Sequence, residues 1–187
     1  MDRDPGRPPL AVVTGVCGSG KTTVGRLLAT RFPSAAFVEG DVLRRMVVSG
    51  RHEMTADPSP AATEALRLRH RQTALLGETF RTAGRTVVVE DVFLDELPCF
   101  LRQIHSGGVH LFVLAPDVGT LLARDAGREK TAYGEGRWDA HALDRELRST
   151  TPRIGLWIDT SAQNAADTTD EIMERFDEGA VDTARLG

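Results

Sequence analysis

Residues Gly15–Thr22 place a lysine and a threonine directly behind a glycine-rich run, in the pattern Gly-x-x-x-x-Gly-Lys-Thr. Glycines let successive backbone N–H groups turn toward one centre without interference from Cβ atoms, which makes a nest for phosphate oxygens. The Lys21 ammonium can bridge the β- and γ-phosphates of a nucleotide, and the Thr22 hydroxyl can take one coordination position on Mg²⁺. The pattern therefore predicts a triphosphate-binding loop rather than a glycine turn that only joins two elements. The predicted phosphate ligands are Gly15, Gly18, Ser19, Gly20, Lys21, Thr22 and Thr23.

A second group that could do chemistry is Asp41, in the stretch "FVEGDVLRR". It follows an apolar run directly, and α/β sheets bind their ligands at the carboxyl ends of such strands. A carboxylate there can accept a proton from a substrate hydroxyl that attacks the γ-phosphate. Arg44 lies one helical turn further on and is suited to holding an anionic or polar substrate. The alternative is that Asp41 only caps the following helix, a role compatible with catalysis.

The stretch "TVVVEDVFL" ends a third apolar run in Glu90 and Asp91. Acidic residues after a buried strand beside a phosphate loop typically organise Mg²⁺, often through water. Either residue could instead cap the next helix, and either could be the base in place of Asp41. Asp91 is also predicted to face the substrate. The pattern leaves the division of roles among Asp41, Glu90 and Asp91 open.

Five short apolar runs are typical of buried parallel strands and would position these groups. They are Leu10–Val13, Ala35–Val38, Thr86–Val89, His110–Leu114 and Leu156–Ile158. Between them, amphipathic stretches predict helices. These stretches are Thr22–Phe32, Val42–Ser49, Ala61–Ala83, Glu96–Ser106, Asp117–Arg128, Ala140–Ser149 and Asp167–Glu178. The alternation predicts an α/β fold with helices on both faces of the sheet.

The chain of 187 residues is about one domain long, and no repeat or long linker divides it. We expect a single domain with its core at about residues 10–178 and loose tails up to Pro9 and beyond about Gly179. The stretch Asp57–Pro60 predicts a loop that leads into the long helix. A glycine-containing segment around Thr131–Arg137 predicts a small lid, covering about residues 125–138.

Composition excludes several classes of protein. A formal charge of −4 argues against a general nucleic-acid binder, which would show a strongly basic face. Cys17 and Cys99 are the only cysteines, so there is no disulfide framework or Cys-x-x-Cys metal site, and a cytoplasmic location is expected. Neither a signal peptide nor a membrane-spanning run is visible.

Several short stretches together resemble the group of small P-loop kinases that contains chloramphenicol phosphotransferase, gluconate kinase, shikimate kinase and adenylylsulfate kinase. The matching stretches are "GVCGSGKTT", "FVEGDVLRR", "VVVEDVFL", "LLARDAGR" and "LWIDTS". The resemblance covers about Leu10 to Phe176, and "EDVFL" is most similar to the chloramphenicol phosphotransferase branch.

The resemblance implies a three-layer sandwich built on a five-stranded parallel sheet of order 2-3-1-4-5. It implies ATP and Mg²⁺ as cofactors, transfer of the γ-phosphate to a hydroxyl, and Asp41 as the general base. The lid of such kinases supplies arginines to the phosphates, and the matching positions are Arg124 and Arg128. Arginine there would neutralise charge on the transferring phosphoryl group.

These observations predict an ATP-dependent phosphotransferase that acts on a hydroxylated metabolite or antibiotic. The alternatives are a nucleoside, nucleotide or sugar-acid kinase, or a nucleotide-binding regulator that transfers nothing. A GTPase would carry Asn-Lys-x-Asp, whereas the only asparagine is Asn164. The expected partners are ATP and a small molecule, not nucleic acid or a membrane. Neither the acceptor nor the oligomeric state follows from the sequence.

Overall fold

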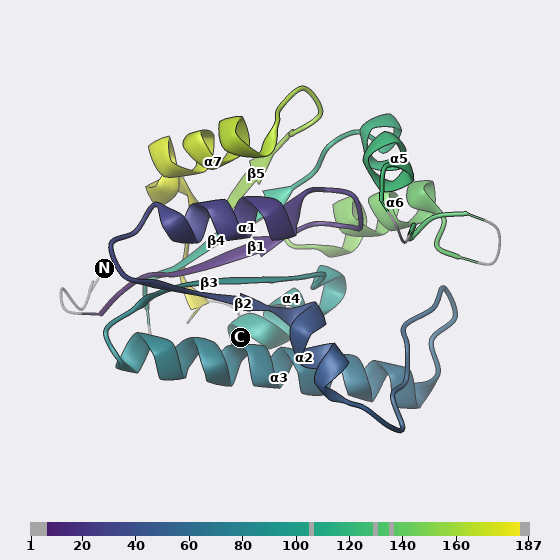
Figure 1. Cartoon of the computed structure of the whole chain (residues 1–187), viewed down its shortest axis with the longest axis horizontal. Coiled ribbons are helices and arrows are strands. Elements are labelled where there is room, and N and C mark those ends of the chain that lie inside the picture. The colour runs from purple at the N-terminus through teal and green to yellow at the C-terminus, as the bar shows by residue number, and fades with distance from the viewer. Residues whose placement is uncertain (1–6, 105–106, 129–130, 135–136, 184–187) are drawn as a thin grey trace.

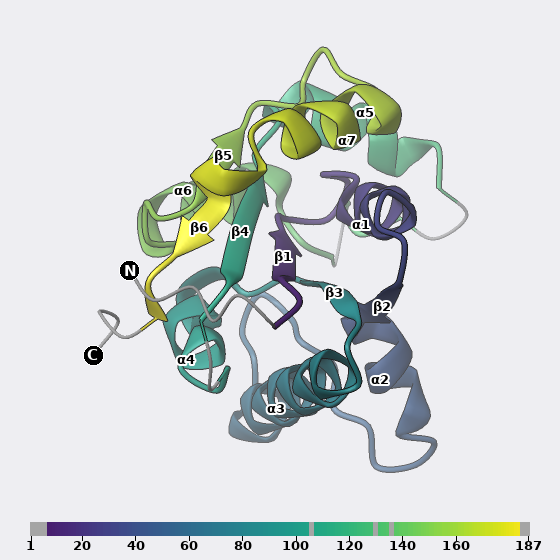
Figure 2. The same ribbon diagram turned by 90° about the vertical axis from the view of Figure 1, so that its left-hand side faces the viewer.

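Six strands form one sheet in the computed structural model of the protein, which describes residues 7–104, 107–128, 131–134 and 137–183. Five of them are parallel and follow the order β2-β3-β1-β4-β5, which confirms the predicted topology (Figure 2). They are β1 (Leu10–Thr14), β2 (Ala35–Glu39), β3 (Thr86–Asp91), β4 (Val109–Leu114) and β5 (Leu156–Ile158). The strands β1, β3 and β4 are buried along their whole length, as near-continuous Val and Leu runs require in a sheet covered on both faces.

Helices cover both faces of this sheet (Figure 1). On one face lie α1 (Lys21–Thr30) and α7 (Ala165–Glu174), which pack on one hydrophobic cluster that includes Val13, Leu28 and Ile172. On the other face lie α3 (Pro60–Thr82) and α4 (Leu97–Leu101), on a second cluster that includes Val12, Val89 and Phe100. The elements α2 (Gly40–Met46), α5 (Val118–Ala126) and α6 (Ala140–Thr150) complete the helices of the described chain.

The strand register brings the chemically active ends of the strands to one edge. Glu39 pairs with Glu90 between β2 and β3, and Thr14 pairs with Asp91 between β1 and β3. Because all three strands run in the same direction, the segments that follow them emerge side by side. The phosphate loop, the start of α2 and the end of β3 therefore share one edge of the sheet.

The ends of the long helices follow local capping rules. Ser59 accepts a hydrogen bond from the Ala62 N–H at 3.2 Å, and Pro60 occupies the first turn of α3, where its missing N–H costs nothing. Asn164 caps α7 with a complete capping box that includes Asp167. The predicted loop at Asp57–Pro60 thus ends where α3 begins, one residue before its predicted start.

Two regions differ from the expectations. The predicted helix Glu96–Ser106 is a 3₁₀ turn (Leu94–Glu96) followed by the short α4, because the chain tightens into turns after Leu101 that bury Ile104. The predicted helix over Val42–Ser49 ends at Met46. Residues 105–106 lie outside the described part of the chain.

The described residues of both predicted tails make contacts with the folded domain. After a 3₁₀ turn (Phe176–Gly179), strand β6 (Ala180–Val181) pairs antiparallel with β4, because Phe176 packs against Phe32 and Phe112 and returns the chain to the sheet. At the other end, the buried Arg81 donates to the Pro8 carbonyl at 2.9 Å. Residues 1–6 and 184–187 lie outside the described residues. Among the described helices, none has the length and apolar character needed to cross a membrane.

Candidate active site

The phosphate loop joins β1 to α1 and depends on glycine at its tightest points. Gly18 has φ +78°, and a Cβ there would lie 2.7 Å from the Leu121 carbonyl oxygen of α5. At Gly15 a Cβ would meet the Leu114 carbonyl oxygen at 2.6 Å. Any side chain at these positions would therefore push the loop away from β4 and α5. The glycines are needed because they let the loop pack closely against these elements and because they allow positive φ angles.

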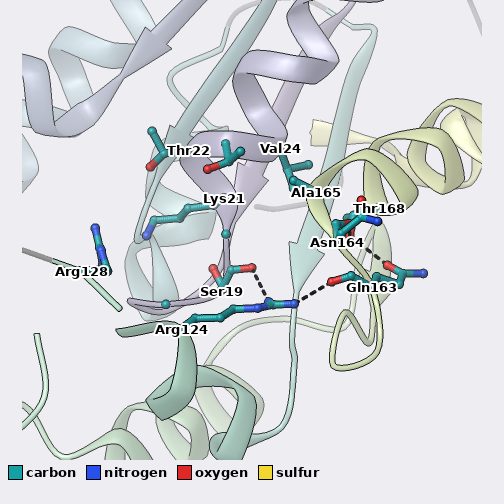
Figure 3. Close-up of a pocket in the computed structure, with 13 residues that line it drawn as sticks. Ser19, Lys21, Thr22, Val24, Arg124, Arg128, Gln163, Asn164, Ala165 and Thr168 are labelled. Atoms are coloured by element: carbon teal, nitrogen blue, oxygen red, sulfur yellow. Dashed lines mark hydrogen bonds between the residues drawn. The ribbon is translucent and has the colours of Figure 1, made fainter. Parts of the chain in front are cut away.

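A cavity of about 330 Å³ opens beside this loop (Figure 3). Its lining comprises residues 18–24, Arg124 and Arg128, and four residues after β5 (Gln163, Asn164, Ala165 and Thr168). Six of the seven predicted phosphate ligands thus line one cavity, whereas Gly15, which directly follows β1, is not part of its lining. The segment after β5 supplies the wall opposite the loop, a contribution that no sequence motif indicated.

The two arginines predicted from the lid line the cavity in different ways. The Arg124 guanidinium donates to the carbonyl of Gln163 at 2.8 Å and more weakly to that of Ser19 at 3.4 Å (Figure 3). It also donates to the carbonyl of Thr160 at 2.7 Å. It thereby ties the phosphate loop to the segment after β5. The Arg128 side chain is 53% exposed, lies 3.7 Å from Asp125 and lines the cavity, so its guanidinium is accessible to a ligand there. Residues 129–130 and 135–136 of the predicted lid lie outside the described residues.

Glu90 stands beside the loop and is almost completely buried. Its Oε1 accepts a hydrogen bond from the Thr22 hydroxyl at 3.0 Å, whereas its Oε2 is buried without a partner among the described residues. Burial raises the pKa of Glu90 to about 7, even though the nearby Lys21 charge acts in the opposite direction. A buried oxygen without a partner next to a threonine hydroxyl is the arrangement that a bound cation would complete.

Asp91 points to the opposite face of the sheet, because successive side chains of a strand alternate. Its Oδ1 accepts from the Arg69 guanidinium of α3 and from the Val92 N–H, both at 2.7 Å. Burial raises the pKa of Asp91, and the Arg69 charge opposes that shift. A Cβ at Gly40 would lie 2.0 Å from Asp91 Oδ2, so glycine is required where α2 crosses this carboxylate. Asp91 is therefore separated from Thr22 and lies with α3.

Asp41 lies in the first turn of α2 with its side chain 52% exposed. Its Oδ1 accepts from Arg44 Nε at 3.1 Å, and Arg69 Nη1 is 4.0 Å away. Partial burial alone would raise the pKa of Asp41, but the charge and hydrogen bond of Arg44, with smaller contributions from Arg69 and Lys21, lower it below its usual value. Asp41 is thus ionised at neutral pH, as a general base must be.

Arg44 and Arg69 make the surroundings of Asp41 a network of charges. Arg44 also binds both carboxylate oxygens of Glu53 at 2.7 and 2.8 Å. Arg69 bridges Asp91 and Asp41 and is mostly buried. In the sequence, Arg69 is one of several charged residues of the predicted helix Ala61–Ala83. Arg69 differs from its neighbours because it lies next to the buried Asp91, and this proximity depends on how α3 packs on the sheet. No pattern in the sequence indicates it.

The structure therefore brings the predicted residues together in two groups. Lys21, Thr22, Arg124 and Arg128 surround the cavity, with Glu90 beneath Thr22. Asp41, Arg44 and Asp91 gather with Arg69 between α2, α3 and the end of β3.

This fold and this loop define the class: the chain has the three-layer architecture and phosphate loop of the P-loop kinases. The chain belongs to the AAA domain family, which matches residues 12–149. No curated protein sequence matches it. The resemblance to small P-loop kinases that the sequence indicated is confirmed.

Three solved structures illustrate the likeness. An unliganded sugar kinase from Janibacter sp. superposes with a TM-score of 0.65 at 20% identity, covering 91% of this chain and 95% of the other. The APS kinase of Mycobacterium tuberculosis, in complex with AMPPNP and APS, superposes with a TM-score of 0.66 at 15% identity, covering 92% of this chain and 99% of the other. A gluconokinase from Sinorhizobium meliloti superposes with a TM-score of 0.57 at 25% identity, covering 96% of this chain and 93% of the other.

Proposed function

We propose that the protein is an ATP-dependent phosphotransferase that moves the γ-phosphate to a hydroxyl of a small molecule, with Asp41 as the general base. The observation that carries this proposal is the position of Asp41. It is an ionised, half-exposed carboxylate on the same sheet edge as the phosphate loop, close enough for the Lys21 charge to lower its pKa. A regulator that only binds nucleotide would have no need of a base at this place.

In the proposed reaction the acceptor oxygen forms a bond to the γ-phosphorus as the bond between that phosphorus and the β,γ-bridging oxygen breaks. The acceptor proton passes to Asp41, and ADP leaves with the electron pair of the broken bond. Lys21 and Arg128 stabilise the negative charge on the transferring group. Arg44 holds the Asp41 carboxylate in place and, with Arg69, can receive polar or anionic groups of the acceptor.

The residues beside the loop fit a Mg²⁺ ion that arrives with ATP. Thr22 can supply a hydroxyl ligand, and the free Oε2 of Glu90 can accept from metal-bound water. No cluster of three or more His, Cys, Asp or Glu among the described residues could hold a metal by itself, so phosphate oxygens and water would supply the remaining ligands. The ion would neutralise phosphate charge during transfer. We assign this role to Glu90 rather than to Asp91, because Glu90 contacts the Thr22 hydroxyl, whereas Asp91 points to the opposite face of the sheet and binds Arg69.

Replacing Glu90 with glutamine should raise the Mg²⁺ concentration needed for half-maximal activity by about 10- to 100-fold, the usual effect of losing a group that orients metal ligands. The amide keeps the size of the side chain but cannot ionise, whereas the Glu90 carboxyl can. A Mg²⁺ titration of phosphoryl transfer at fixed ATP measures the effect. A Mg²⁺ dependence equal to that of the parental protein would remove Glu90 from the metal site.

Replacing Arg128 with alanine should lower kcat by about 10²-fold with a smaller change in KM for ATP, because a charge that acts on the transferring phosphoryl group stabilises mainly the transition state. For Arg124→Ala we expect a lower kcat together with a higher KM for ATP, because the Arg124 guanidinium joins both walls of the cavity. Arg71→Ala is a matched control, because Arg71 is exposed on α3 and pairs with Glu64. An unchanged kcat for Arg128→Ala would exclude Arg128 from the reaction.

The proposal as a whole is tested by ATP consumption with a panel of hydroxylated metabolites and antibiotics, with Asp41→Ala as the control protein. We expect at least one acceptor to yield ADP and a phosphorylated product in a reaction that Asp41→Ala does not support. If the protein binds ATP tightly and phosphorylates no acceptor, a nucleotide-binding regulator becomes the better description.

A further inference from the structure

The backbone of the phosphate loop is held from behind by a side chain far away in the sequence. The hydroxyl of Tyr133 donates a hydrogen bond to the Cys17 carbonyl oxygen at 2.7 Å. Tyr133 is 8% exposed, and its ring belongs to the larger hydrophobic cluster. Burial raises the pKa of the phenol, so the hydroxyl keeps its proton and remains a donor.

Tyr133 is itself fixed in place by its backbone. The buried Asp125 at the end of α5 accepts from the Ala132 N–H at 2.9 Å and from the Tyr133 N–H at 3.1 Å. Both hydrogen bonds involve a charged acceptor and are therefore among the stronger kinds. The same helix approaches the loop directly, since the Leu121 carbonyl lies against Gly18. The phenol thus reaches Cys17 from a rigid support.

The hydrogen bond determines the orientation of one peptide group. The Cys17–Gly18 peptide is planar and trans, so the Gly18 N–H points away from the side on which the Cys17 carbonyl meets Tyr133. Gly18 lines the phosphate cavity, whereas Cys17 and Tyr133 are not among its lining residues. The N–H therefore belongs to the face of the loop that a phosphate would occupy.

A glycine-rich loop has little intrinsic preference for this orientation. Gly18 and Gly20 both have positive φ and can adopt many other conformations, so the correct arrangement depends on contacts from outside the loop. Fixing it before the ligand binds reduces the ordering that binding must impose. A hydrogen bond to the carbonyl also polarises the peptide and strengthens its N–H as a donor.

We propose that Tyr133 is a positioning residue for the nucleotide phosphates, because its hydroxyl holds the Cys17–Gly18 peptide with the Gly18 N–H directed into the phosphate site. The inference rests on the proposed nucleotide binding at this loop. It goes further by assigning a contribution to phosphate affinity to a residue that touches no ligand.

The test is Tyr133→Phe, which removes the hydroxyl and keeps the ring in the core. We expect the Kd for ADP and for a non-hydrolysable ATP analogue to rise by about 2- to 12-fold, the equivalent of one neutral hydrogen bond. The Kd for adenosine should not change, because adenosine has no phosphate that could bind the loop. Calorimetry measures the nucleotides, and an NMR titration measures the weaker adenosine.

Thr73→Val provides a matched control, because it also removes a buried hydroxyl that donates to a backbone carbonyl, that of Arg69 at 3.0 Å. It should lower stability by a similar amount and leave ADP affinity unchanged. Parental ADP affinity in Tyr133→Phe, or an equal loss of ADP and adenosine affinity, would overturn the inference. A parental protein that binds no ADP would instead contradict the proposed function and, with it, this inference.

Discussion

Replacing Lys21 with alanine should lower the rate of phosphoryl transfer by at least about 10²- to 10³-fold while the fold stays intact. Lys21 begins α1 in the phosphate loop, lines the cavity and takes no part in either hydrophobic cluster. Its ammonium is the only lysine charge at the described site and would lie against the β- and γ-phosphates, where negative charge is concentrated. Lys21→Ala should therefore reduce the rate of phosphoryl transfer and leave the stability of the fold unchanged.

The measurement pairs steady-state turnover with thermal unfolding of the same preparations. Arg31→Ala is the matched control, because it removes a positive charge at the other end of the same helix, where Arg31 pairs with Asp170. We expect Arg31→Ala to retain its turnover and Lys21→Ala to retain its melting temperature. Near-parental turnover in Lys21→Ala would show that this loop does not carry the catalysis.

The second large effect is expected for Asp41→Asn, which should reduce transfer to the true acceptor by about 10²- to 10⁴-fold, the usual contribution of a positioned general base. Asparagine keeps the size of the side chain. Asp41 lies within the first turn of α2, whose N-cap is Glu39, and it makes no capping hydrogen bond, so ATP affinity and melting temperature should change little. Titration with a non-hydrolysable ATP analogue gives the affinity, and a product assay gives the rate of transfer.

Asp41→Asn removes the base and also weakens an ion pair of Arg44, which binds both Asp41 and Glu53. A control must therefore weaken the ion pairs of Arg44 without removing the base. Glu53→Gln removes the second partner and leaves the base in place, so we expect it to reduce transfer far less than Asp41→Asn. If Asp41→Asn transfers phosphate at the parental rate, the base lies elsewhere and Glu90 is the next residue to replace. Early melting and loss of ATP binding in Asp41→Asn would show that Asp41 is structural.

The core of the fold could be predicted from the sequence because the information that specifies it is local. Four of the five predicted strands lie within one or two residues of those observed, and Leu156–Ile158 matches its prediction. A continuous run of Val and Leu can satisfy its backbone and bury its side chains only inside a sheet. The short β6 was not predicted, because its pairing with β4 depends on Phe176 packing on the sheet.

The phosphate loop was likewise determined by the sequence itself. Its glycines, Lys21 and Thr22 all lie within eight consecutive residues between a strand and a helix, so the motif identifies the loop and its ligand class, although contacts from outside fix the orientation of its peptides. The position of Asp41 just after β2 follows in the same way from the direction of a strand.

Only the tertiary structure decided how Glu90 and Asp91 divide between the two sides of the sheet. Alternation places them on opposite faces, but the face that meets the phosphate loop depends on which helices cover each side. The same holds for Arg69, which reaches Asp91 across 22 positions in the chain, and for Tyr133, which reaches Cys17 across 116. Such contacts form because helices of this chain pack at particular places on the sheet, and no short stretch of residues contains that information.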